Sequence, residues 1–205
     1  MRVVVFGASG RTGRLVVGEA LERGHQVLAF VRSPSKLGLS HPQLTLAQGD
    51  ATSAADVDSA VHGSEAVVSV LGLAADSPPN VCSVGVANIV GSMTERGVKR
   101  LICLSDYGNG ETRARGLYSR FLWLVIRAHL EDKEKMEATV RSSGLDWTIV
   151  RATILSDGAK TGKYRVGPEI KIGLVPRISR RDVAHFIVEQ IADASFVGAS
   201  PSISY

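Results

Sequence analysis

The sequence predicts a single-domain α/β fold: a doubly wound parallel sheet with a small hairpin and a helix at its C-terminal end. Short apolar runs alternate with longer helical stretches along most of the 205 residues. The apolar runs are continuous, as expected of strands that helices cover on both faces. A chain of this length is sufficient for one domain with a full core and is short for two.

The expected strands are rich in Val, Ile and Leu. They are Val3–Phe6, Gln26–Val31, Leu44–Gln48, Ala66–Val70, Arg100–Leu104 and Trp147–Val150. The helices expected between them are Gly10–Arg23, Ala54–Val61, Val81–Arg96 and Tyr118–Ser143. Repeated strand–helix–strand units indicate a parallel sheet with right-handed crossovers. Gly24, Gly97 and Gly144 follow three of these helices, where glycine commonly ends a helix.

The pattern changes after Val150. The segment "TGKYRVGPEIKIG" predicts two short strands around Gly167 and Pro168. A helix is then expected in "SRRDVAHFIVEQIADA", with Ser179 as its N-cap and Asp182 in its first turn, where a carboxylate interacts favourably with the helix dipole. The sequence contains no linker or repeat, so one domain is expected over residues 1–205.

The composition is typical of a soluble globular protein with a net charge of +4, and the use of only two cysteines favours a reduced, cytoplasmic setting. Its basic clusters, Arg96–Arg127 and Lys160–Arg181, come without a nucleic-acid-binding motif, so they favour a solvated surface or a small phosphorylated ligand over nucleic acid. The longest apolar run, Phe121–Ile126, is too short to cross a membrane, and no signal peptide is expected. Cys82 and Cys103 have neither a disulfide framework nor metal-site spacing, so no metal is expected.

The stretch "VFGASGRTG" carries Gly7, Gly10 and Gly13 between a strand and a helix. In a nucleotide-binding turn, the first glycine permits the tight turn, the second lets the backbone approach a diphosphate, and the third lets the helix pack closely on the strand. The helix N-terminus presents amides and the positive end of its dipole to the phosphates. We therefore expect a Rossmann-type dinucleotide site. Its loop residues are Gly7, Ser9, Gly10, Arg11, Thr12 and Gly13.

The second strand ends in "FVRSPSK". A site for NAD normally has Asp or Glu at this point, to accept hydrogen bonds from the ribose 2′-hydroxyl. Arg32, with Lys36 and Arg11 nearby, instead suits a 2′-phosphate, because a guanidinium group pairs bidentately with phosphate. The sequence thus predicts NADP(H) as the cofactor.

Together with "GDATSAADVDSAVHGSEAVVSVLG", "RSSGLDWTIVRA", "TGKY" and "RISRRDVAHF", these motifs resemble the atypical short-chain dehydrogenases, the NAD(P)H-binding group that includes the NmrA-like proteins. Over nearly the full length, the resemblance is closest to the flavin reductase (NADPH), or biliverdin reductase B, type. It implies a Rossmann fold and NADPH-dependent hydride transfer to a flavin or a similar flat conjugated acceptor. The flavin would be a substrate rather than a bound prosthetic group.

The resemblance also implies further cofactor contacts. Asp50 and Ala51 would flank the adenine. The ribose and nicotinamide would be contacted by Leu71, Gly72, Leu73, Cys103, Ser105, Ala152, Thr153 and Ile154. The substrate pocket is expected from loops 72–80, 105–125 and 152–178.

Two departures from the flavin reductase pattern predict an altered acceptor pocket. Ala152 and Thr153 in "VRATILSDG" stand where prolines and a histidine are usual, and "LAADSPPN" lacks an arginine. Biliverdin is therefore not the expected acceptor.

The candidate catalytic residues are Ser105, His129 and Lys133. Ordinary members of the group use serine with a Tyr-x-x-x-Lys pair, and His129 stands where that tyrosine is expected. His129 is interpreted either as a proton donor near neutral pH or as a surface histidine. Lys133 is interpreted as a solvent-side or cofactor-supporting charge, paired with Glu137 one turn later. Flavin reduction does not require the tyrosine, because the protein supplies mainly proximity and the proton can come from water.

The segment "RARGLYSRFLWLVIRAHL" is apolar around more of a helix than one core face needs. It is interpreted as a helix buried on two sides, a substrate lid or a dimer surface. Trp123 or Tyr107 could stack on a flavin or belong to the core. The alternative function left open is a non-catalytic NADP(H) sensor acting through a protein partner. We expect a small-molecule acceptor, no nucleic acid or membrane partner, and a monomer or weak homodimer.

Overall fold

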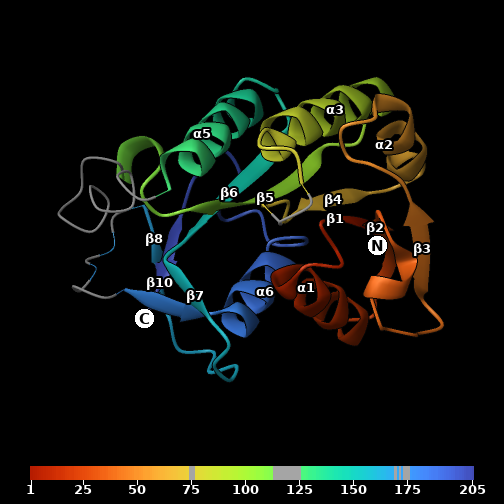
Figure 1. Cartoon of the computed structure of the whole chain (residues 1–205). Coiled ribbons are helices and arrows are strands. Elements are labelled where there is room, and N and C mark those ends of the chain that lie inside the picture. The colour runs from red at the N-terminus through yellow and green to blue at the C-terminus, as the bar shows by residue number, and fades with distance from the viewer. Residues whose placement is uncertain (74–76, 113–125, 169, 171, 173–175) are drawn as a thin grey trace.

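The computed structural model describes residues 1–73, 77–112, 126–168, 170, 172 and 176–205 (Figure 1). Within these residues the main sheet has eight strands in the order β3-β2-β1-β4-β5-β6-β10-β8. They are β1 Arg2–Phe6, β2 Gln26–Val31, β3 Leu44–Gln48, β4 Ala66–Ser69, β5 Arg100–Asp106, β6 Asp146–Ala152, β8 Arg165–Gly167 and β10 Ser202–Ser204. Neighbouring strands pair in parallel except β10 and β8, which pair antiparallel. The strand order reverses between β1 and β4, which confirms the predicted doubly wound fold.

Helices cover both faces of this sheet (Figure 1). On one face, α1 (Arg11–Glu22) packs beside α6 (Arg180–Glu189). The other face carries α2 (Ala54–Val61), α3 (Val81–Arg96) and α5 (Arg127–Arg141). Two short 3-10 turns, η1 (Pro34–Lys36) and η2 (Gly110–Thr112), follow β2 and β5.

Strand β1 explains why the predicted strands are apolar without alternation. Val3 and Val5 belong to the buried cluster beneath α1 and α6, whereas Val4 and Phe6 belong to the cluster beneath α2, α3 and α5. Successive side chains of a strand point to opposite faces, so both sets must be apolar when both faces are covered.

Helix ends follow the expected local chemistry. Ser179 is the N-cap of α6, and its Oγ accepts a hydrogen bond from the Asp182 amide at 3.0 Å, as predicted. Gly97 ends α3 with φ of +70°, a conformation that glycine adopts without strain.

The C-terminal part differs from the expected local hairpin. Strand β8 pairs with β10, and the second strand predicted around Pro168 falls partly on residues 169, 171 and 173–175, outside the described residues. Strands β7 (Ile154–Ser156) and β9 (Arg177–Ser179) form a separate parallel pair. Three-residue strands of this kind carry too little periodicity to be recognised in sequence.

Helix α5 begins at Arg127. The first part of the predicted helix falls within residues 113–125, outside the described residues, and this includes Trp123 and the expected lid or dimer surface. Tyr107, the other predicted stacking residue, is buried in the core. In the part of the chain that is described, no helix combines the length and apolar character needed to cross a membrane.

Candidate functional site

A cavity of about 750 Å³ opens at the carboxyl ends of β1, β2, β4 and β5. Ligands of doubly wound folds bind at this edge, where the strand order reverses. The volume lies within the range of small-molecule sites. Most predicted site residues line the cavity. They are Gly7, Ser9, Gly10, Arg11, Thr12, Gly13, Arg32, Lys36, Asp50, Ala51, Leu71, Gly72, Leu73, His129 and Lys133.

The glycine loop brings backbone, rather than side chains, to one end of the cavity. Gly7 has φ of +77°, and a Cβ there would lie 2.7 Å from the Val70 carbonyl oxygen. A Cβ on Gly13 would lie 2.1 Å from the carbonyl oxygen of Gly7. Helix α1 starts directly afterwards, with Gly10 as its N-cap and no side-chain cap among the described residues. Its first amides therefore lack intrahelical acceptors, and such a helix start is suited to bind an anion.

Cationic side chains lie beside this loop. Arg32 and Lys36 are exposed and line the cavity. Nη2 of Arg32 donates to Ser77 Oγ at 3.2 Å. Arg14 ties the glycine loop to η1, because Nε donates to the Ser9 carbonyl at 3.1 Å and Nη2 to the Lys36 carbonyl at 2.5 Å.

Asp50 lies after β3. Its carboxylate accepts hydrogen bonds from the Thr52 amide and hydroxyl, both at 2.8 Å. These bonds hold the pKa of Asp50 below its usual value, so it is a fixed anion across the neutral range.

The residues at this end fit a phosphorylated dinucleotide. At Gly7 and Gly13 a Cβ would collide with the backbone, and among the described residues no side chain caps the amides at the start of α1. At the end of β2, Arg32 occupies the place where an acidic residue would accept a ribose hydroxyl. A guanidinium group at that point matches a phosphate group instead.

The other end of the cavity is built from side chains of α5. Lys133 is buried, and its Nζ donates to the carbonyl oxygens of Leu71 and Leu104, each at 2.7 Å. Burial alone would lower the pKa of this ammonium, but the acidic groups around it, Cys82 and Asp106 foremost, raise it above its usual value. Of the two interpretations of Lys133, the solvent-side one is wrong, because the side chain is buried and ties the loop after β4 to the end of β5, and the cofactor-supporting one stays a prediction.

The expected pairing of Lys133 with Glu137 is also wrong. Glu137 instead accepts from Arg151 and Arg141. Both residues lie on the buried face of α5, so tertiary partners replace the one-turn pair.

His129 lies one turn before Lys133 and lines the cavity beside Asp106, the last residue of β5. His129 Nε2 and Asp106 Oδ2 are 2.9 Å apart. Burial would raise the pKa of Asp106, but the hydrogen bond from His129 and the charge of Lys133 lower it. His129 Nδ1 is buried and has no hydrogen-bond partner in the described structure. The interpretation of His129 as a helix-surface residue is therefore wrong, since it faces the cavity and a carboxylate.

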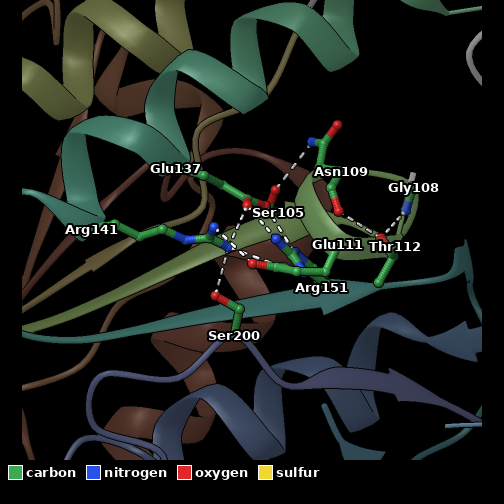
Figure 2. Close-up of polar contacts among 9 residues, drawn as sticks. All are labelled: Ser105, Gly108, Asn109, Glu111, Thr112, Glu137, Arg141, Arg151 and Ser200. Atoms are coloured by element: carbon green, nitrogen blue, oxygen red, sulfur yellow. Dashed lines mark hydrogen bonds and ion pairs between the residues drawn. The ribbon is translucent and has the colours of Figure 1, made fainter. Parts of the chain in front are cut away.

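The remaining predicted residues lie away from the described lining of the cavity. Cys103 is fully buried beneath the helices of the α3 face, and burial raises the pKa of its thiol to about 12. Ser105 is buried, and its Oγ accepts from Asn109 Nδ2 at 3.4 Å (Figure 2). Ala152 and Thr153 are also buried, whereas Ile154 is exposed at the start of β7.

An ionic network with a buried pair, Arg151 and Glu137, at its centre holds α5 in place (Figure 2). Arg151, only 2% exposed, donates to the two carboxylate oxygens of Glu137 at 3.2 and 2.7 Å, and to Glu111 at 2.5 Å. Arg141 donates to the same two carboxylates and to Ser200. The network joins α5 to β6 and to the turn after β5, and it therefore fixes the helix that carries His129 and Lys133.

The cavity contains residues that sequence reasoning missed. Asp106 directly follows Ser105 at the end of β5, so the strand-end signal that selected Ser105 could have found it. Arg180, the first residue of α6, lines the opposite side, where its Nη1 donates to Asp157 Oδ1 at 2.7 Å. The other oxygen of Asp157 accepts from Arg11.

Comparisons with known proteins show the family to which the chain belongs. A family model described as NAD(P)H-binding matches residues 7–194. The uncharacterized chloroplastic protein At2g34460 of Arabidopsis thaliana is 31% identical over 93% of this chain and 71% of its own length. Reductase pytE of Aspergillus terreus is 26% identical over 99% of this chain and 97% of its own length.

Among solved structures, ChuY, an anaerobillin reductase from Escherichia coli O157:H7, has the same fold. Its TM-score is 0.83 at 21% identity, over 99% of this chain and 96% of that one. The resemblance to atypical short-chain dehydrogenases is thus confirmed at the level of the family. Matched over most of its length, the chain belongs to the NAD(P)H-binding family.

Proposed function

We propose that this protein is an NADPH-dependent oxidoreductase that transfers a hydride to a flavin or a similar flat conjugated acceptor. The observation that carries the proposal is the charge at the end of β2, where Arg32 faces a cavity that opens beside a dinucleotide-type glycine loop. Membership of the NAD(P)H-binding family and full-length similarity to a reductase support it.

In this proposal the diphosphate binds at the first turn of α1, and Arg32 with Lys36 binds the 2′-phosphate. Asp50 and Ala51 flank the adenine. The backbone at 71–73 lines the ribose and nicotinamide. When bound, NADPH supplies the hydride. The chain supplies its position against the acceptor, which by itself accounts for much of the rate of such a transfer.

The apolar rim near α5 favours a flat acceptor. Leu73 and Ile126 line the cavity and are 45% and 37% exposed, so ring-shaped ligands could cover them. Leu155 lines the cavity from the C-terminal part. Burial of such side chains against a conjugated ring is favourable, and the contact limits the orientations that the ring can adopt in the cavity.

We assign the proton-bearing role to His129. Its Nε2 is held by the Asp106 carboxylate, which orients the ring, and its Nδ1 has no partner in the described structure. Lys133 acts as a positioning residue, because its ammonium joins the two backbone segments beside this pair. Ser105 remains a candidate from the sequence alone.

An acceptor screen tests the proposal. The purified protein is mixed with NADPH and, in turn, riboflavin, FMN and a set of quinones, and the loss of NADPH absorbance is followed. The proposal predicts turnover above the protein-free rate with at least one flat acceptor. Binding of NADPH without turnover for every acceptor would contradict it.

The same screen separates the alternative, a non-catalytic NADP(H) sensor. The histidine in place of the usual tyrosine favours this alternative, since it removes the ordinary proton donor of the group. A sensor would bind NADP⁺ and NADPH with comparable affinity and would transfer no hydride from NADPH to any acceptor.

A further inference from the structure

Two arginines from distant parts of the chain meet at one carboxylate beside the cavity. Arg11 is the first residue of α1, and Arg180 is the first residue of α6. Both line the cavity. Asp157 binds Arg180 through Oδ1 at 2.7 Å and Arg11 through Oδ2. One anion therefore holds two cations at the end of the cavity where the glycine loop lies.

The two ion pairs of Asp157, with Arg180 and with Arg11, differ in how well the surrounding structure fixes them. Asp157 and Arg180 directly follow Ser156 and Ser179, which pair in register between β7 and β9. That pair is fixed by a local sheet. The pair of Asp157 and Arg11 connects the C-terminal part to the glycine loop and is open to solvent, since these side chains are 62% and 67% exposed. An exposed ion pair of this kind is weak and is easily exchanged.

Arg180 is the less hydrated of the two arginines. Its side chain is 15% exposed, and burial lowers the pKa of its guanidinium group. A partly buried cation gains more from an anionic partner than an exposed one does. Two guanidinium groups on one carboxylate leave an excess positive charge. The oxygens of a diphosphate could pair with both groups, and the amides of the first turn of α1 lie beside them.

We propose that Arg180 and Arg11 both bind the diphosphate of the dinucleotide, and that Asp157 is an internal anion that holds Arg11 until this diphosphate replaces it. The ligand class is a dinucleotide, recognised through its diphosphate. The inference rests on the proposed function only in requiring that the cavity takes a dinucleotide, and it does not require hydride transfer. Arg180 raises the affinity for the dinucleotide, and Asp157 lowers it by competition.

Titration calorimetry with NADP⁺ tests the inference in the full chain without an acceptor. Arg180→Gln should weaken binding about tenfold, as expected for loss of a charge-assisted hydrogen bond. Asp157→Asn should tighten binding about threefold, because a weak competing ion pair is removed. Arg181→Gln is the matched control. It removes the same charge from the next residue of α6, which is exposed and lies outside the described lining of the cavity, and it should change affinity by less than about twofold.

Inorganic diphosphate serves as the second probe. It should compete with NADP⁺ in the wild type and bind more tightly to Asp157→Asn than to the wild type. Arg180→Lys should keep part of the affinity, since it keeps the charge without the planar fork. Near-UV circular dichroism identifies any variant that fails to fold, and Arg180→Lys then carries the test of that position.

The outcomes separate the inference from the proposed function. If the wild type binds NADP⁺, but Arg180→Gln matches Arg181→Gln or Asp157→Asn binds no more tightly than the wild type, the inference is overturned and the proposed function stands. If the variants behave as expected but no acceptor is reduced, the inference stands and the reductase proposal fails. Failure of the wild type to bind NADP⁺ overturns both.

Discussion

The two ends of the cavity are built in different ways. The end beside β1 and β2 consists of glycine backbone, helix amides and exposed cations such as Arg32. At the end beside β5 and α5, Lys133 is buried, and Lys133 and Asp106 are held in place by partners from other elements. The first end depends on local geometry, and the second depends on tertiary structure.

This difference has consequences for stability and function. Substitutions of the exposed cations at the glycine-loop end should change which dinucleotide binds, with little effect on stability, because these charges are solvated. Substitutions in the ionic network of Arg151 and Glu137 should lower stability, because a buried charge that loses its partner is strongly unfavourable. Each prediction below tests one side of this contrast, and the largest expected effect comes first.

Arg151→Met should destabilise the protein by about 3–5 kcal/mol, because it leaves the buried carboxylate of Glu137 without its main partner. Urea denaturation measures the loss. The double variant Arg151→Met with Glu137→Leu is the control, and it should recover most of the stability by replacing the ion pair with apolar side chains. A loss below about 1 kcal/mol in the single variant would show that the network does not support α5.

His129→Gln should lower turnover about 100-fold at unchanged NADPH affinity, because it removes the proton-bearing group beside Asp106. Steady-state kinetics and NADPH titration separate these two effects. His41→Gln, an exposed histidine elsewhere, controls for loss of an imidazole. Ser105→Ala should change turnover by less than about threefold, because Ser105 is buried and absent from the described lining. Equal losses in the Ser105 and His129 variants would refute this assignment.

Arg32→Asp should weaken NADPH binding about 30-fold through loss of a charge-assisted contact to the 2′-phosphate. NADH lacks that phosphate, so its affinity should change far less. Lys99→Asp applies the same change of charge just before β5, at the amino ends of the strands and away from the cavity. It should leave both affinities similar to those of the wild type. Equal losses for NADPH and NADH in Arg32→Asp would remove Arg32 from the phosphate site.

Substitution of Glu111 by Gln should have the smallest effect on stability, and the size of this effect should depend on pH. Burial would raise its pKa, but hydrogen bonding to Arg151 and the charges of Arg151 and Arg141 lower it from 4.5 to about 2. A carboxylate with a lowered pKa in the folded state contributes stability that is present above about pH 4.5 and is lost as the pH falls toward 2. In urea denaturation, the wild type should therefore exceed Glu111→Gln in stability near neutral pH. The difference should narrow in acid, and a constant difference would contradict the ion pair.

The sequence could predict the fold and the glycine-loop end because their signals are contiguous. Strand β1, the turn at Gly7 and the start of α1 follow one another directly, and Arg32 comes directly after the next strand. Such contiguous signals can be recognised in a sequence without knowledge of tertiary contacts.

The α5 end could not be predicted in the same way. His129 and its partner Asp106 are 23 residues apart, and Lys133 and Leu71 are 62 apart. Glu137 shows the same limit, because helix spacing pairs it with Lys133 while the packed chain pairs it with Arg151. At the end of β5, the choice between Ser105 and Asp106 depends on which face of the strand the cavity occupies, and packing decides that.

The central claim is that one cavity binds NADPH through Arg32 and presents its hydride to a flat acceptor. The most direct measurement is the rate of NADPH oxidation by the wild-type protein with FMN as acceptor, beside the same assay with NADH. We predict kcat/KM at least about tenfold higher with NADPH, as expected for one charge-assisted phosphate contact. Equal values for the two nucleotides, or rates equal to the protein-free background with both, would contradict the account.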